Sequence, residues 1–369
     1  MKFLISFFLI SLMMILPACG ADNVEEQVLE NSASVNEITE ENETSEEIET
    51  TEEISVNTGE PEEISGTLSF YTSQPDADAV ALADGFKAKY ENVDVEIFRS
   101  GTEEVISKLL AEEEAGAVQA DVLLVADAVT FEGLKEKGLL LSYESPELNA
   151  IPDEFVDVDN MYSGTKIMST IMAVNTNMVD EMPTSWSALT SEEALNEVIM
   201  PSPLYSGAAA YNAGVFSRTK DFGWEFYEDL HDNEATVVQG NGAVLKSVAG
   251  GEKAYGMVVD FIVASSKLEG APVELIYPDE GVPVITEPVG ILGNTDNEAA
   301  AKAFVDFILS EEGQKLSIGV GYTPIREGLA PPEELKGVDE LTVLSNDLTD
   351  LLKTREEDKE QFRSIFGDE

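Results

Sequence analysis

Three short segments of the chain combine hydroxyl side chains with the expected start of a helix. They are Thr72-Ser73-Gln74, Ser100-Gly101-Thr102 and Tyr205-Ser206-Gly207. Hydroxyls and the free backbone N–H groups of a helix start donate hydrogen bonds to an anion, and the helix dipole favours negative charge there. Each segment alone also fits an ordinary helix cap, because Ser and Thr are preferred cap residues. Together the three predict a site that holds a phosphate without many cations.

Three carboxylates are candidates for the other half of this site. Asp260 lies at the end of the expected strand 255–259, Asp127 follows the expected strand 121–126, and Glu287 precedes a proline. Carboxylates accept hydrogen bonds from hydroxyl or ammonium groups. If these residues do not bind a ligand, Asp127 and Asp260 would cap helices, and Glu287 would stabilise a hinge.

The composition excludes several kinds of site. The 369 residues include 73 Asp and Glu, 21 Lys and Arg, one His and one Cys, and the formal net charge is −52. A nucleic-acid partner is excluded, because binding a polyanion needs clusters of basic residues. One Cys allows no intramolecular disulfide and no CxxC metal site, and one His allows no multi-histidine cage. We therefore expect neither a metal nor a cofactor.

Catalysis is also disfavoured. Ser206 is a conceivable nucleophile, but it lacks the Gly-x-Ser-x-Gly elbow. The single histidine, His231, lies in the polar stretch 229–233, which predicts a helix end and a surface turn. We predict that the chain is not an enzyme.

The first nineteen residues predict an export signal. Residues 3–16 are apolar apart from two serines, which is short for a membrane span but typical of a signal-peptide core. Small or aliphatic residues then precede Cys19, a pattern that resembles the bacterial lipobox. That resemblance implies a diacylated Cys19, carrying palmitate-type chains, which anchors the protein to the membrane. The alternative is an ordinary secretory cleavage site with an incidental cysteine.

Residues 20–65 predict a disordered acidic tether. They contain 16 acidic residues, no Lys or Arg and no aromatic residue, so they bury too little apolar area to fold. The remaining residues, 66–369, carry 57 acidic against 20 basic residues, a net charge of −37. This excess concerns solubility rather than fold.

From Gly66 onward, strands alternate with helices, which indicates an α/β fold built on parallel sheet. Apolar periodicity predicts strands at 68–71, 93–98, 121–126, 166–174, 199–203, 255–261 and 273–277. It predicts helices at 76–90, 131–137 and 298–309, helix starts at 100–102 and 205–208, and a helical stretch from Glu333.

Several strings in this order resemble one family. They are Tyr71-Thr72-Ser73, Arg99-Ser100-Gly101-Thr102, 120–124, 202–209, 281–288, 300–314 and 322–326. The chain resembles the extracytoplasmic solute-binding proteins of ABC importers, in the branch of ferric-ion, hexose-phosphate and phosphonate binders. The resemblance implies two doubly wound α/β lobes joined by crossing strands, with the ligand cleft between them. Lobe 1 would comprise 66–164 with 288–325, and lobe 2 would comprise 165–287 with 326–369.

The resemblance implies a binding protein that captures a small solute by lobe closure and delivers it to an ABC permease and its ATPase. We expect a monomer, lipid-anchored on the extracytoplasmic face of the cell membrane. The helix starts favour a phosphate- or phosphonate-bearing organic solute. Ferric iron is the alternative, but the family's adjacent tyrosines are missing after Gly256, where 258–261 reads Val-Val-Asp-Phe. A polyamine held by acidic groups with Tyr205, Tyr211 and Tyr162 is the third option.

Overall fold

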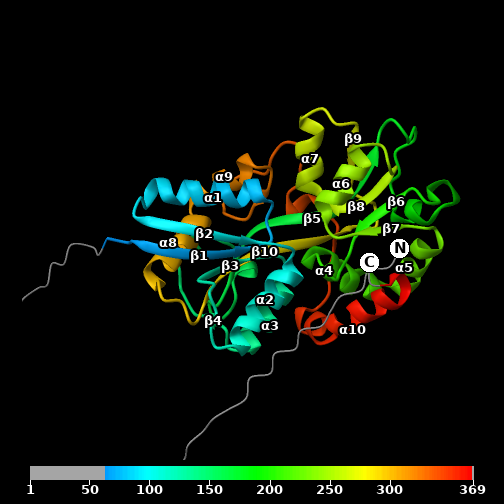
Figure 1. Cartoon of the computed structure of the whole chain (residues 1–369). Helices are drawn as coiled ribbons and strands as arrows, with labels where there is room; N and C mark the ends of the chain where they lie inside the picture. Colours follow the sequence, from blue (N-terminus) through cyan, green and yellow to red (C-terminus); the bar gives the residue numbers. More distant parts are fainter. Residues whose placement is uncertain (1–62, 368–369) are drawn as a thin grey trace, which may run out of the picture. The chain divides into compact units, whose positions relative to one another are not determined.

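The computed structural model describes residues 63–367, and Figure 1 shows their arrangement. The predicted signal segment 1–19, with Cys19, and all but the last three residues of the predicted tether 20–65 lie outside the described residues. Within residues 63–367, no helix combines the length and the apolar character needed to cross a membrane.

One lobe, called lobe 1 here, is built on the parallel strands β2, β1 and β3, in that spatial order. Each strand runs into a helix, so three helices begin at the same edge of the sheet. Phe304, which lies in the helix 298–309, completes the core, because its ring packs edge-on against Phe70 and Phe86. The elements are β1 (Gly66–Thr72), α1 (Asp76–Lys89), β2 (Val93–Arg99), α2 (Thr102–Glu114), β3 (Val122–Leu124), α3 (Ala128–Glu136), β4 (Leu140–Leu141), η1 (Pro146–Ala150), η2 (Asp153–Phe155), α8 (Glu298–Leu309) and α9 (Glu311–Gly319).

Two long antiparallel strands, β5 (Ser163–Asn175) and β10 (Val282–Leu292), connect the lobes. β10 pairs with β3 of lobe 1, whereas β5 pairs with β8 of the other lobe. All thirteen residues of β5 are buried, which explains its nearly continuous run of apolar and small residues. The predicted crossing strands are therefore present, and the predicted α/β fold of two lobes is confirmed.

Lobe 2 is built on the parallel strands β8, β6 and β7. Trp186 lies in its core, where the indole packs edge-on against Phe216 and donates a 2.8 Å hydrogen bond to the carbonyl of Gly281. The elements are η3 (Trp186–Thr190), η4 (Glu192–Ala194), β6 (Val198–Pro201), α4 (Gly207–Arg218), α5 (Gly223–Asp232), β7 (Thr236–Val238), α6 (Asn241–Ala249), β8 (Tyr255–Val259), α7 (Asp260–Leu268) and β9 (Val273–Ile276).

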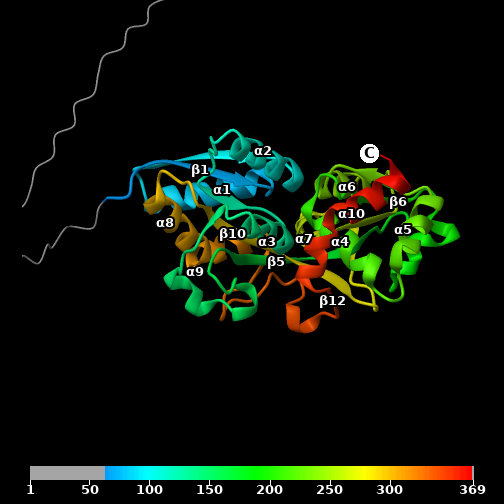
Figure 2. The same ribbon diagram turned by 90° about the horizontal axis from the view of Figure 1, so that it is seen from below.

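The C-terminal helix α10 (Leu348–Phe366) packs against α4 and α5 of lobe 2 and against α3 of lobe 1 (Figure 2). The prediction of helix from Glu333 is wrong for residues 333–347. That segment holds a 3₁₀ turn, η5 (Val338–Glu340), and a short strand, β12 (Val343–Leu344), which pairs with β10. The short strand β11 (Thr323–Pro324) pairs with β5. The residue boundaries predicted for the two lobes stay a prediction.

Candidate functional site

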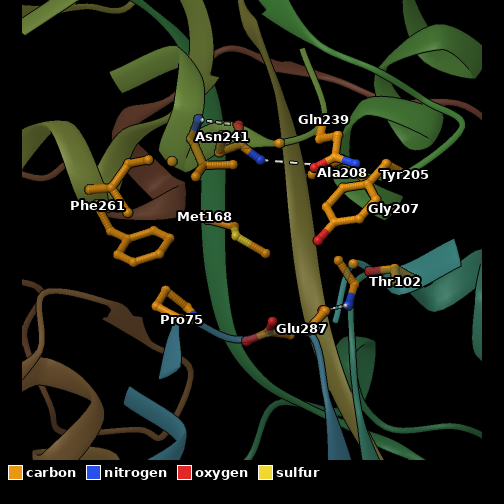
Figure 3. A pocket seen from close by; sticks show the side chains of 18 of the residues that line it. Pro75, Thr102, Met168, Tyr205, Gly207, Ala208, Gln239, Asn241, Phe261 and Glu287 are labelled. Carbon is orange, nitrogen blue, oxygen red and sulfur yellow. Dashed lines mark hydrogen bonds between the residues drawn. The ribbon is translucent and has the colours of Figure 1, made fainter. Parts of the chain in front are cut away.

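A pocket of about 340 Å³ lies where both lobes meet the crossing strands (Figure 3). Its wall contains the starts of five helices: α1 and α2 from lobe 1, and α4, α6 and α7 from lobe 2. This arrangement follows from the topology, because helices that follow parallel strands begin at the carboxyl edge of a sheet, where ligands bind in open α/β folds. The two carboxyl edges face the same space.

Hydrogen bonds link the residues at three of these helix starts. Ser206 caps α4, since its Oγ accepts a 3.3 Å hydrogen bond from the backbone N–H of Ala209. Asn241 of α6 donates through Nδ2 to the Ser206 Oγ over 3.5 Å, and its Oδ1 accepts from the N–H of Val259 over 3.2 Å (Figure 3). The starts of α4, α6 and α7 therefore form one connected wall.

The first N–H groups of a helix have no partner inside the helix. Gly207 and Ala208 both line the pocket, and within residues 63–367 their N–H groups have no acceptor. These donors lie beside the positive end of the α4 dipole, which is suited to an anion.

The lobes touch each other at the pocket. A Cβ atom on Gly207 would lie 2.4 Å from the carbonyl oxygen of Ala126, and one on Gly101 would lie 2.5 Å from the ring of Tyr205. The N–H of Glu103 donates to the carbonyl of Tyr205 over 3.3 Å. At Gly207 the close atom is backbone, so only glycine fits there, whereas a side chain at position 101 would require the Tyr205 ring to move. These two close approaches bring α2 and α4 together across the cleft.

The structure brings seven of the twelve predicted binding residues to the pocket wall. They are Ser73, Gly101, Thr102, Tyr205, Ser206, Gly207 and Glu287. All three predicted loops therefore contribute to one wall. Whether these residues contact a solute stays a prediction.

Five predicted residues have other surroundings: Thr72, Gln74, Ser100, Asp127 and Asp260 are not part of the pocket wall. Thr72 accepts a hydrogen bond from the N–H of Gln74, and Ser100 donates to Glu104. Asp127 caps α3 by accepting from the N–H of Thr130 over 2.9 Å, which is the structural alternative for this residue.

Gln74 differs from the other four. Its side chain is buried, and among the described residues its Oε1 has no hydrogen-bond partner. Because buried polar atoms are normally satisfied, this oxygen is one of the few exceptions among the described residues.

Asp260 is fully enclosed behind the wall. Its Oδ1 accepts from the N–H groups of Ser169 and Phe261, at 3.1 and 2.9 Å, and its Oδ2 accepts from the hydroxyl of Tyr277 at 3.2 Å. Burial raises the pKa of this carboxyl to about 6, even though the three hydrogen bonds act in the opposite direction. The residue joins α7 to the crossing strand β5.

Glu287 lies at the pocket floor and is ion-paired with Lys166 of the other crossing strand, at 2.6 Å. The Lys166 ammonium also lies 4.7 Å from the ring centre of Tyr322. Tyr322 donates to Asp78 of α1 over 2.9 Å and stacks on Phe261 of α7. Burial raises the pKa of the Tyr322 phenol well above its usual value, so this group is a neutral donor.

Sequence reasoning missed several residues of the wall. Arg99, at the carboxyl end of β2, lines the pocket, and its Nε donates to the carbonyl of Gln74. The start of α6 could have been predicted, because Gly-Asn-Gly at 240–242 follows the short β-like run 236–238 and so has the same strand-to-helix pattern as the three predicted loops. Met168, Phe261 and Tyr322 form apolar parts of the wall, and apolar side chains carry no signal that separates a pocket from a core.

Of the three tyrosines in the polyamine hypothesis, Tyr205 lines the pocket, whereas Tyr162 and Tyr211 lie outside the pocket wall. Tyr162 donates to Glu132 over 2.5 Å, and burial raises the pKa of Tyr211 to about 12. Within residues 63–367, no group of three or more His, Cys, Asp or Glu side chains is arranged to hold a metal ion.

Comparisons with known proteins agree with this architecture. The sequence pattern of the family described as bacterial extracellular solute-binding protein matches residues 81–342. A probable ABC transporter periplasmic-binding protein of Sinorhizobium fredii is 25% identical over 255 residues, which cover 66% of this chain and 70% of that protein.

Two of the similar solved structures each cover 81% of this chain. The periplasmic binding protein AfuA of Actinobacillus pleuropneumoniae, with exogenous fructose-6-phosphate bound, has a TM-score of 0.75 and 26% identity, covering 81% of this chain and 98% of that one. Iron-bound HitA of Pseudomonas aeruginosa has a TM-score of 0.71 and 24% identity, covering 81% and 99%, and shows the fold alone. These relatives are solute-binding proteins and not enzymes. The chain therefore belongs to the bacterial extracellular solute-binding proteins, as its sequence predicts, and is the extracytoplasmic substrate-binding protein of an ABC transporter.

Proposed function

We propose that the protein captures a small organic solute bearing a phosphate or phosphonate group, and presents it to the permease by closure of its lobes. The observation that carries this proposal is the convergence of five helix starts on one pocket. Each favourable helix end contributes about 0.3–1 kcal/mol to the binding of an anion, and up to ~2 kcal/mol when partly buried. Several together support a phosphate site with few cations.

The remaining wall suits the organic part of such a solute. Glu287 offers carboxylate oxygens to hydroxyl groups, and Phe261 and Met168 offer apolar surface. Arg99 adds a guanidinium group, which pairs well with phosphate oxygens. The bound fructose-6-phosphate of AfuA, the relative with 26% identity, supports the same class of solute.

Ferric iron and polyamines are supported less well by these side chains. Ferric iron would need several carboxylate or phenolate oxygens. A polyamine would need several carboxylates or aromatic faces for its ammonium groups. Among the residues lining the pocket in the described part of the chain, Glu287 is the one carboxylate, and Lys166 already pairs with it. The Tyr322 phenol is held in its protonated form by burial. Iron-bound HitA has the same fold, so iron is kept as the competing candidate.

Calorimetry on the purified protein tests the proposal. Fructose 6-phosphate, fructose, inorganic phosphate, a phosphonate, spermidine and ferric citrate form the panel. We expect heat from phosphorylated or phosphonate compounds and none from fructose. Tight binding of ferric citrate, with no heat from any phosphorus compound, would contradict the proposal.

Thr102→Val is expected to weaken binding of the best phosphorus compound about ten- to hundred-fold. The change keeps the shape of the side chain and removes a hydroxyl at the start of α2, whose hydrogen bond to a charged group is worth about 1.5–3 kcal/mol. Thr190→Val is the matched control, because its hydroxyl donates to the carbonyl of Ser187 and neither residue lines the pocket. Equal solute affinities of the two variants would show that the Thr102 hydroxyl does not contact the solute.

We also propose that Cys19 carries the lipid anchor and that the protein is a monomer. Cys19→Ala is expected to release the protein into the medium and to abolish labelling by fatty-acid precursors. Retention of the variant at the membrane would contradict the anchor. Light scattering of the purified protein measures the monomer mass.

A further inference from the structure

Helix α10 is anchored in lobe 2. Phe362 packs against Tyr227 in the lobe 2 core, and Asp358 pairs with Arg218 of α4 at 2.9 Å. Leu351 of α10 lies so close to α4 that a Cβ on Gly214 would come within 2.7 Å of its Cδ2. We therefore assign the body of this helix to lobe 2, although it also contacts α3 of lobe 1.

Two cations of α10 nevertheless pair with lobe 1. Arg355 donates through Nη1 to the Asp127 carboxylate over 2.8 Å and through Nη2 to the Glu103 carboxylate over 3.0 Å. Lys359 donates to the second oxygen of Glu103 over 2.9 Å. The α10 cations and the lobe 1 carboxylates thus form one connected cluster.

This cluster is shielded from solvent, unlike most surface ion pairs. The Arg355 and Asp127 side chains are 10% and 1% exposed. Burial alone would raise the pKa of Glu103, but the charges of Arg355 and Lys359 outweigh it, and the pKa lies below its usual value. Removing one partner from a buried charge pair is costly, because the other charge stays uncompensated.

The cluster also lies beside the pocket. Glu103 follows Thr102, and Asp127 follows Ala126, and both preceding residues line the pocket. The two carboxylates would repel an anionic solute if Arg355 and Lys359 did not neutralise them. A movement of lobe 1 away from α10 would separate these four groups.

We propose that Arg355 and Lys359 of α10 form a cross-lobe latch with Asp127 and Glu103, which stabilises the closed arrangement of the lobes around the pocket. The latch assigns Asp127 to closure instead of direct solute contact. It does not depend on the proposed identity of the solute, since its contacts are made within the protein.

The distance between the lobes tests the latch. Spin labels at Glu91→Cys and Glu269→Cys, in a Cys19→Ser background, report this distance by electron–electron double resonance without any solute. Arg355→Met is expected to raise the ratio of open to closed molecules about ten-fold or more, because it removes hydrogen bonds between charged groups. Lys359→Met, a milder change, is expected to act in the same direction.

Lys135→Met is the matched control. It removes a similarly shielded cation, but its partner Asp157 belongs to the same lobe, and the two side chains are 18% and 3% exposed. We expect it to lower the melting temperature and leave the distance distribution unchanged. The latch is overturned if Arg355→Met and Lys359→Met keep the original distribution, or if Lys135→Met shifts it equally. Circular dichroism confirms that each variant is folded.

Discussion

Lys166→Met is expected to lower the free energy of unfolding by about 3–5 kcal/mol, because it leaves the Glu287 carboxylate buried without its counter-charge. The two side chains are only 2% and 4% exposed and join the two crossing strands directly. Chemical denaturation followed by circular dichroism measures the effect. The variant is also expected to weaken solute binding, because Glu287 lies in the pocket floor.

Two further variants separate the cost of an unpaired charge from the cost of lost packing. The double variant Lys166→Met with Glu287→Gln is expected to recover much of the lost stability, because no uncompensated charge remains. Lys315→Met breaks the exposed pair with Glu311, where the side chains are 61% and 63% exposed, and is expected to cost no more than about 1 kcal/mol. A double variant as unstable as Lys166→Met alone would show that packing dominates.

Asp260→Asn is expected to stabilise the protein at pH 8. The pKa of Asp260 is raised to about 6 in the folded protein from a reference value of 3.8, so the folded state favours the protonated form. Its contribution to stability is therefore fully present below pH 4 and is lost as the pH rises through 6. The loss at pH 8 is on the order of 3 kcal/mol at most, at 1.36 kcal/mol per pKa unit.

An asparagine at this position keeps the hydrogen bonds without the charge, since its oxygen accepts from the N–H groups of Ser169 and Phe261 and its amide donates to Tyr277. The unfolding free energy should thus depend less on pH between 4 and 7 in the variant. Asp232→Asn, at an exposed position, is the control. An unchanged pH profile in Asp260→Asn would mean that Asp260 is not the titrating group.

The sequence predicted those features whose cause is local. Helix α8 was predicted with its observed bounds, because Ala300, Phe304 and Phe307 repeat at helical spacing. The helix start at 205–208 was predicted from the local sequence, and the Ser206 cap is the structural alternative given for that segment, since capping involves only neighbouring residues. The three hydroxyl-bearing loops share one wall because strand–helix alternation places their helix starts at the carboxyl edges of the two lobes, and these edges face the same space.

Features that depend on distant residues were not predictable in this way. Lys166 and Glu287 are 121 positions apart, and nothing in either local sequence selects the other. A carboxylate at the end of a strand can either cap the next helix or face a cleft, and the local sequence does not distinguish the two. Asp127 caps α3, and its second oxygen pairs with Arg355, which is distant in the sequence. Residues 333–347 were mistaken for helix because their charge resembles that of α10, whereas two of them, Val343 and Leu344, pair with β10 as the short strand β12.

The division of the pocket wall between the lobes has a kinetic consequence. Two helix starts belong to lobe 1 and three to lobe 2, so a solute held by both cannot leave without first losing its contacts with one of them. If the solute is captured by lobe closure as proposed, its residence time is set by how often the lobes separate spontaneously, and not by the strength of any single hydrogen bond. A permease that pulls the lobes apart would shorten this residence time without touching the solute.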